Sequence, residues 1–187
     1  MLDDRPVLRN VSVEIGPGLT LLRGPNGAGK TTVLRAIAGL VPLARGSRAV
    51  SAPPLFIGHR SMLLRGLSAR ANLSFFASFR GTSAADVDEA LRRWGLSELA
   101  DRPVERLSAG QRRRAALARL DIEQQPVVLL DEPFADLDRT GILLVRDAIV
   151  SAVVRGQAVV LVTHAREELD RDATQRLMID AGEVRAI

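Results

Sequence analysis

The segment Gly24-Pro25-Asn26-Gly27-Ala28-Gly29-Lys30-Thr31 decides the fold of this 187-residue chain. It matches the phosphate-binding pattern G-x-x-x-x-G-K-[ST] at every defined position. Gly27 and Gly29 allow the backbone to approach a phosphate closely and to direct N–H groups towards it. Lys30 is the only lysine among 26 basic residues. A compact ammonium on a flexible stem can follow a β- and a γ-phosphate, whereas the planar arginine fork would fill the loop differently. The alternative is that one lysine survived by chance in an arginine-biased composition.

The sequence on either side of this loop predicts the structural context of a P-loop NTPase. Residues 19–22 form a short apolar run that reads as a buried strand. Residues 31–40 have helical spacing, with Val33, Leu34, Ile37 and Leu40 on one face. We therefore expect strand, loop and helix in that order. In this context Lys30 contacts the β- and γ-phosphates, Thr31 offers its hydroxyl to Mg²⁺, and Thr32 completes the nucleotide-binding stretch.

The rest of the chain alternates between strand-like and helical patterns, which predicts an α/β fold with a mainly parallel sheet. Strands are expected at 11–15, 127–131, 158–163 and 177–180, and helices at 139–154 and from residue 166; residues 55–57 form a short apolar run. Residues 68–119 read mainly as helices, and Ser108 is the expected N-cap of a helix that runs to about residue 124. We predict a single domain, with residues 1–58 and 126–187 as the nucleotide-binding core and 59–125 as an inserted helical subdomain.

A pair of carboxylates follows the predicted strand at 127–131. Asp131 and Glu132 come at its C-terminal end, the edge where an α/β sheet places its ligands. Asp131 is the expected partner of Mg²⁺, through water, and Glu132 is positioned to polarise an attacking water. The alternative is a strand that simply ends in solvated acids, and it is less favoured because the sequence also contains the phosphate-binding loop.

Three further motifs identify a family resemblance. Leu107-Ser108-Ala109-Gly110-Gln111 opens a helix, Ala135-Asp136-Leu137-Asp138 follows the carboxylate pair, and His164 follows the strand at 158–163. This order and spacing resemble the nucleotide-binding subunit of ABC transporters over nearly the whole chain, with Ala109 where glycine is usual. The resemblance implies an ATPase that uses ATP and Mg²⁺. It also implies that Ser108, Gly110 and Gln111 cap the γ-phosphate of ATP bound to an opposite subunit. By the same resemblance, His164 contacts the γ-phosphate and the attacking water, and Asp138 lies in the loop that crosses the dimer interface. A serine N-cap with free N–H groups at a helix start is an anion site on physical grounds as well.

His59 is a departure that points to a subfamily. Most members carry glutamine there, thirteen residues before the asparagine that Asn72 matches, and that glutamine senses Mg²⁺ and relays motion to the membrane partner. Three stretches are similar to the haem-exporter ATPases of cytochrome c biogenesis: Gly58-His59, Asp131-Glu132-Pro133-Phe134 and residues 107–120. The family's adenine-stacking aromatic would fall near Met1-Leu2, and the chain has no tyrosine. Either aliphatic or arginine contacts hold the base, or the recorded start lies inside the true gene.

Composition limits the partners. No apolar run approaches the roughly 18 residues that span a bilayer, and no signal peptide opens the sequence. We expect a homodimer or a dimer with a related ATPase, bound to separate transmembrane permease subunits at the cytoplasmic side of the inner membrane. The net charge is only +4, and Arg112-Arg113-Arg114 splay around a helix, so we expect phosphate neutralisation or a solvated face rather than nucleic-acid binding.

Other functions remain as alternatives. The first is the ATPase of another exporter, of the multidrug or ABC-2 type. A second is an ABC ATPase that acts on nucleic acid or ribosomes, although the chain lacks the long coiled coils of repair members and the tandem domains of translation factors. A regulatory module without catalysis is disfavoured by Glu132 and His164.

Overall fold

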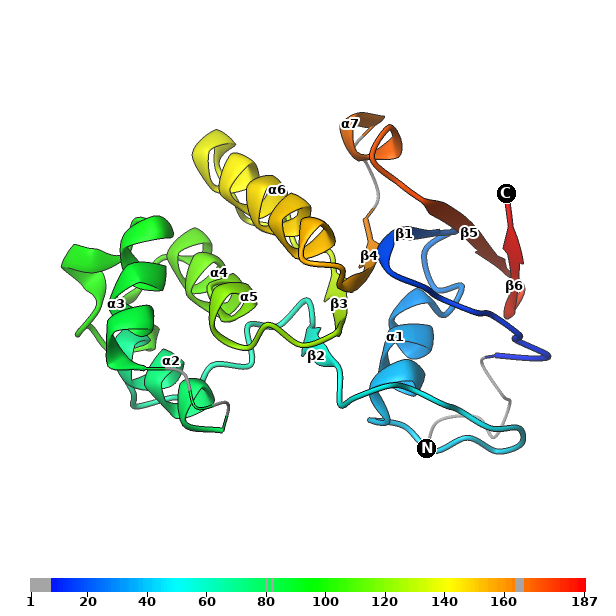
Figure 1. Cartoon of the computed structure of the whole chain (residues 1–187), viewed down its shortest axis with the longest axis horizontal. Helices are drawn as coiled ribbons and strands as arrows, with labels where there is room; N and C mark the ends of the chain where they lie inside the picture. Colours follow the sequence, from blue (N-terminus) through cyan, green and yellow to red (C-terminus); the bar gives the residue numbers. More distant parts are fainter. Residues whose placement is uncertain (1–7, 80, 82, 164–166) are drawn as a thin grey trace. The chain divides into compact units, whose positions relative to one another are not determined.

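The computed structural model describes residues 8–79, 81, 83–163 and 167–187 (Figure 1). They form two compact units: the described residues within 1–56, 125–132 and 153–187 belong to the first, and those within 57–124 and 133–152 to the second. The predicted division into a core of 1–58 and 126–187 and a helical subdomain of 59–125 follows the motifs and stays a prediction. The compact units additionally group residues 133–152 with the helices.

The elements of the first unit lie mostly in one six-stranded sheet. The strands are β1 (Gly18–Arg23), β2 (Leu55–Ile57), β3 (Val127–Asp131), β4 (Ala158–Val162), β5 (Gln175–Asp180) and β6 (Glu183–Ala186). Their order in the sheet is β2-β3-β4-β1-β5-β6. The pairs β3–β4, β4–β1 and β1–β5 are parallel, and β5–β6 is antiparallel. Because the parallel strands share one carboxyl edge, the segments that follow β1, β3 and β4 all leave the sheet on the same side.

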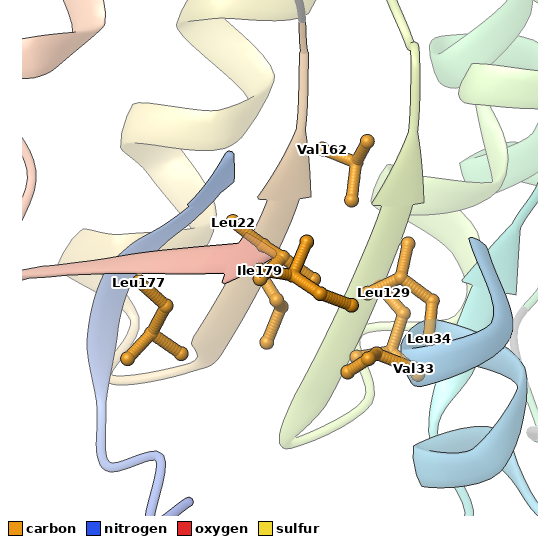
Figure 2. Close-up of a cluster of buried hydrophobic side chains, with 8 residues drawn as sticks. Leu22, Val33, Leu34, Leu129, Val162, Leu177 and Ile179 are labelled. Atoms are coloured by element: carbon orange, nitrogen blue, oxygen red, sulfur yellow. The ribbon is translucent and has the colours of Figure 1, made fainter. Parts of the chain in front are cut away.

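A hydrophobic core joins this sheet to α1 (Lys30–Ala38). Figure 2 shows Val33 and Leu34 of α1 beside Leu129 of β3, with Ile179 of β5 close by. The helix buries these two residues because they lie on one face, as their spacing predicts. It ends at Gly39, whose φ of 73° closes the last turn in the left-handed conformation that glycine adopts without strain. The prediction that Leu40 lies on the buried face is wrong, because the helix ends before this residue and Leu40 is exposed. The core therefore fixes the start of α1 against the sheet, and with it the loop that precedes the helix.

The second unit is helical, with α2 to α5 in green and α6 in yellow in Figure 1. It contains α2 (Ala69–Ser78), α3 (Ala84–Arg93), α4 (Ala109–Leu117), α5 (Arg119–Ile122) and most of α6 (Arg139–Val154), with 3₁₀ turns at Ser97–Leu99 and Val104–Arg106. Three of these helices begin with a serine whose hydroxyl accepts a hydrogen bond from the first turn: Ser68, Ser83 and Ser108. Trp94, the only tryptophan, is fully buried and donates from Nε1 to Oδ2 of Asp121 at 2.8 Å.

Several local predictions differ from the observed elements. Residues 11–15 alternate between half-buried and exposed, and Val13 and Ile15 pack on the core, yet the segment forms no strand. The helix predicted from Ser108 to residue 124 is divided at Ala118 into α4 and α5. The antiparallel strand β6 was not predicted at all. The short helix expected from residue 166 is α7 (Glu167–Asp170).

Candidate nucleotide-binding site

The glycine loop connects the carboxyl end of β1 to the first turn of α1. Gly24, Gly27 and Gly29 all have positive φ, at 151°, 78° and 104°. At Gly24 a Cβ atom would collide with the backbone carbonyl oxygen of Ile179, so this position requires glycine for space as well as for conformation. At Gly27 no atom beyond the adjacent residues lies within 4 Å of the position of a Cβ, so the loop surface is open there. An open, exposed stretch of backbone before a helix N-terminus is suited to receive a phosphate.

Lys30 folds back over this loop. Its side chain is only 8% exposed, and Nζ donates to the carbonyl oxygens of Gly24 at 2.8 Å and Pro25 at 2.9 Å. The ammonium therefore holds the two ends of the loop together from inside its curve. An incoming phosphate would meet a positive charge that is already positioned.

Thr31 and Asp131 lie side by side although they are 100 residues apart. Oγ1 of Thr31 donates to Oδ2 of Asp131 at 2.8 Å, and Asp131 is 4% exposed. A hydroxyl and a carboxylate oxygen are hard donors of the kind Mg²⁺ prefers, with waters and substrate phosphates as its remaining ligands. Among the described residues no group of three or more His, Cys, Asp or Glu side chains could hold a metal ion. The residues present therefore fit a Mg²⁺ that arrives with a nucleotide, and do not make a metal cage of their own.

Glu132 directly follows β3 in an unusual backbone conformation. Its φ is 49°, a left-handed value that costs a non-glycine residue free energy. Its backbone N–H donates to the carbonyl oxygen of Val162, the last residue of β4, at 2.9 Å. The sheet thus fixes the backbone from which the Glu132 side chain emerges. His164, the other predicted catalytic side chain, lies outside the described residues.

The predicted signature residues begin α4 in the second unit. Ser108 and Gln111 form a reciprocal capping box: the Ser108 hydroxyl accepts from the Gln111 N–H at 3.2 Å, and Oε1 of Gln111 accepts from the Ser108 N–H at 2.9 Å. A Cβ atom on Gly110 would lie 2.8 Å from the carbonyl oxygen of Asp136, so glycine permits close packing of the loop after Glu132. Asp138 caps α6 by accepting from the Gly141 N–H at 2.7 Å.

His59 is exposed, in the loop that connects β2 to α2. The far end of this loop is held by Asn72, which is fully buried. Its Oδ1 accepts from the Leu64 N–H at 2.6 Å, and its Nδ2 donates to the carbonyl oxygens of Leu64 and Ser68. The asparagine matched by sequence therefore shapes the loop that carries His59.

The three consecutive arginines of α4 are not equivalent. Arg112 donates to the carbonyl oxygen of Leu107, and Arg114 to that of Trp94. Arg113 is 4% exposed and donates to three backbone carbonyls in two other loops. The expectation of a solvated or phosphate-neutralising face is wrong for Arg113. Its burial was readable from the helical period, because position 113 shares a face with Ala116, Leu117 and Leu120.

The predicted site residues thus fall into two groups, each assembled within its own unit. Residues 24–32 with Asp131 and Glu132 meet at the carboxyl edge of the sheet. Within that stretch Ala28 packs on the core, Thr32 is half-buried, and Pro25 and Asn26 are exposed. Ser108, Gly110, Gln111 and His59 belong to the helical unit. No described helix is long and apolar enough to cross a membrane.

Comparison with known proteins identifies the family. A model of the ABC transporter family matches residues 8–135. The cytochrome c biogenesis ATP-binding export protein CcmA of Ruegeria pomeroyi is 40% identical over 183 residues, covering 97% of this chain and 86% of that protein. The protein of the same name from a Chelativorans species is 41% identical over 187 residues, covering 94% and 92%. The dimeric structure of the ATP-binding cassette MJ0796 bound to ADP and Pi has a TM-score of 0.84 and 25% identity, covering 97% of this chain and 90% of the other.

This chain belongs to the ABC transporter family. Its fold is that of an ABC ATPase, and the predicted α/β P-loop architecture is confirmed. The enzyme class predicted from the sequence, an ATPase whose hydrolysis is coupled to transport, is confirmed as well.

Proposed function

We propose that this chain binds and hydrolyses ATP to drive export through a separate membrane partner in cytochrome c biogenesis. The proposed partner is the haem exporter, which is indicated by His59 and by the sequence motifs similar to haem-exporter ATPases. The observation that carries the ATPase role is the 2.8 Å contact between Thr31 and Asp131 beside the ammonium of Lys30. The relatives that are about 40% identical over most of the chain support the export role.

The phosphates are held by the glycine loop and Lys30. Backbone N–H groups of residues 27–31 and the N-terminus of α1 bind the β- and γ-phosphate oxygens, and Lys30 exchanges its two carbonyl partners for phosphate. Thr31 and Asp131 would hold Mg²⁺, which supplies charge neutralisation between the phosphates when bound. Because the loop is already shaped, little ordering is required when ATP arrives.

Glu132 acts on the attacking water and His164 on the γ-phosphate. The backbone of Glu132 is fixed by the bond to Val162, so its carboxylate can accept a proton from a water placed in line with the γ-phosphate. Two copies of the chain, or one copy and a related ATPase, close head-to-tail. In that arrangement Ser108, Gly110 and Gln111 of one copy complete the site on the other. The complex lies at the cytoplasmic side of the inner membrane, and nucleic acid has no part in it.

The test is Glu132→Gln. We expect this variant to bind ATP with wild-type affinity and to lose about 10²-fold or more in kcat, since general base catalysis contributes that order of rate. ATP should also convert it to a stable dimer, measured by analytical ultracentrifugation. Wild-type turnover in this variant would remove Glu132 from the chemistry. Co-purification of the tagged chain with permeases of cytochrome c maturation tests the export role separately, and their replacement by permeases of another exporter would contradict it.

A further inference from the structure

Arg113 is a buried cation of the helical unit, close to the start of α4. It lies five residues after Ser108, on the face of the helix that points away from solvent. A guanidinium stays charged at every accessible pH, so burying it is costly unless acceptors surround it. What it contacts therefore indicates what it does.

Three acceptors of Arg113 are backbone carbonyls of two separate loops. Nη1 donates to the carbonyl oxygen of Gly58 at 2.6 Å and to that of His59 at 3.3 Å. Nε donates to the carbonyl oxygen of Pro133 at 3.2 Å. One rigid planar group thus bonds the loop of His59 with one nitrogen and the segment that follows Glu132 with another.

Each of the two loops is also held in place by contacts away from Arg113. The His59 loop is closed at its far end by Asn72, which holds Leu64. The Pro133 segment directly follows Glu132, whose N–H donates to the carbonyl oxygen of Val162. It continues to Asp136, whose carbonyl oxygen packs so closely on Gly110 that a Cβ atom there would lie 2.8 Å from it. A displacement of either loop at its Arg113 end must therefore move the guanidinium or break its hydrogen bonds.

We propose that Arg113 is a positioning residue that couples the His59 loop to the backbone carrying Glu132. Its role is to position the backbone of these loops and not to act on the substrate directly. By holding the Pro133 carbonyl it sets the backbone direction after Glu132, and by holding the Gly58 and His59 carbonyls it passes a movement of one loop to the other. This inference rests on the proposed function, because it assigns Arg113 a role in presenting Glu132 to the attacking water.

The test separates charge from geometry. Arg113→Lys keeps a buried cation, but a single ammonium cannot replace Nε and Nη1 at their two positions. We expect ATP affinity by calorimetry within about twofold of wild type, since the glycine loop is unchanged, and kcat lowered about tenfold, within the range typical of coupling residues. Arg92→Lys, at an arginine whose side chain is 70% exposed on α3, is the control and should keep wild-type kcat.

Hydrogen exchange distinguishes a coupling role of Arg113 from a purely structural one. In the Glu132→Gln background, which retains ATP, nucleotide should change amide exchange in both the 24–32 and the 59–64 segments. Adding Arg113→Lys should abolish the change in 59–64 and leave that in 24–32. Wild-type kcat with an intact exchange response would overturn the coupling role. So would an equal loss of ATP affinity, or an unfolded Lys variant. If instead Glu132→Gln hydrolyses ATP normally, the proposed function itself fails, which is a separate outcome.

Discussion

Positive φ values at single residues shape the nucleotide site. Glu132 adopts a φ of 49° that glycine would adopt without cost, and the sheet holds it there through Val162. Gly24 has a φ of 151° and is also pressed against Ile179. The two residues show two solutions to one problem, a sharp departure of the chain from the end of a strand.

Gly24 and Gly27 offer a matched pair of substitutions. Gly24→Ala should lower the free energy of unfolding by about 2–4 kcal/mol, because it adds a clash with the Ile179 carbonyl to the cost of a left-handed alanine. Gly27→Ala should cost only about 1–2 kcal/mol, the conformational part alone, since its Cβ meets open space. Urea unfolding without nucleotide measures both. Equal losses would show that the loop relaxes around Gly24 and that the contact with Ile179 is unimportant.

Among the elements, α3 shows how strongly a helix start depends on one serine and one acid. The Ser83 hydroxyl accepts from the Asp86 N–H, and the Asp86 carboxylate accepts from the Ser83 N–H at 2.9 Å and its hydroxyl at 2.7 Å. The hydroxyl bond first, and the backbone bond second, hold the pKa of Asp86 below its ordinary value. The same geometry at Ser108 uses glutamine in place of the acid, so that α4 has a cap without a carboxylate next to the proposed phosphate site.

The α3 cap predicts a pH dependence. Because the folded pKa of Asp86 is lower than its unfolded value, its contribution to stability is present above about pH 4 and is lost as the pH falls through the folded pKa. Asp86→Asn should therefore flatten the unfolding free energy over this acidic range. The fluorescence of Trp94, buried at the end of α3, can follow urea unfolding of this unit. Ser83→Ala removes the larger donor and should flatten the same curve in part; an unaltered curve would contradict the role of the cap.

Elements that depend on neighbouring residues could be predicted from sequence, and those that depend on distant partners could not. β1, the glycine loop, α1 and β3 each have a local pattern, and the motifs placed Thr31 and Asp131 at one edge. β6 is an exception, because its partner β5 directly precedes it; this strand is short and largely exposed and so lacks a clear apolar pattern of its own. Its signal was the turn Ala181-Gly182, both with positive φ, which is a two-residue hairpin connection. Three backbone acceptors of Arg113 come from loops 20 to 55 residues away, and only its burial was readable in advance.

For the whole molecule, the proposed dimer divides each active site between two chains. Lys30 and Asp131 belong to one copy, and Ser108 comes from the other. Ser108→Asp is a useful variant, because aspartate caps helices about as well as serine while placing a negative charge against phosphate. It should therefore keep α4 and still disable the site.

Mixing two inactive variants tests this division. Lys30→Ala loses nucleotide affinity, and Ser108→Asp loses closure, so each should be inactive alone. In a mixed dimer, one site receives the intact loop of the Ser108→Asp chain and the intact Ser108 of the Lys30→Ala chain. Random pairing of equal amounts should restore about a quarter of wild-type ATPase activity, since half of the dimers are mixed and each has one working site. Activity that stays at the level of the separate variants would mean that the sites are not shared.

The single lysine also has a consequence for handling the protein. Apart from the amine at the chain start, the side chain that bridges Gly24 and Pro25 is the only primary amine in the sequence. Attachment to a sensor surface through amines, or cross-linking with an amine-reactive ester, therefore has two targets, and one of them is the centre of the phosphate loop. For binding studies the protein is better immobilised through an added tag. In amine-coupled samples, some molecules would be attached through Lys30 and could not bind nucleotide, so the number of working sites would be underestimated.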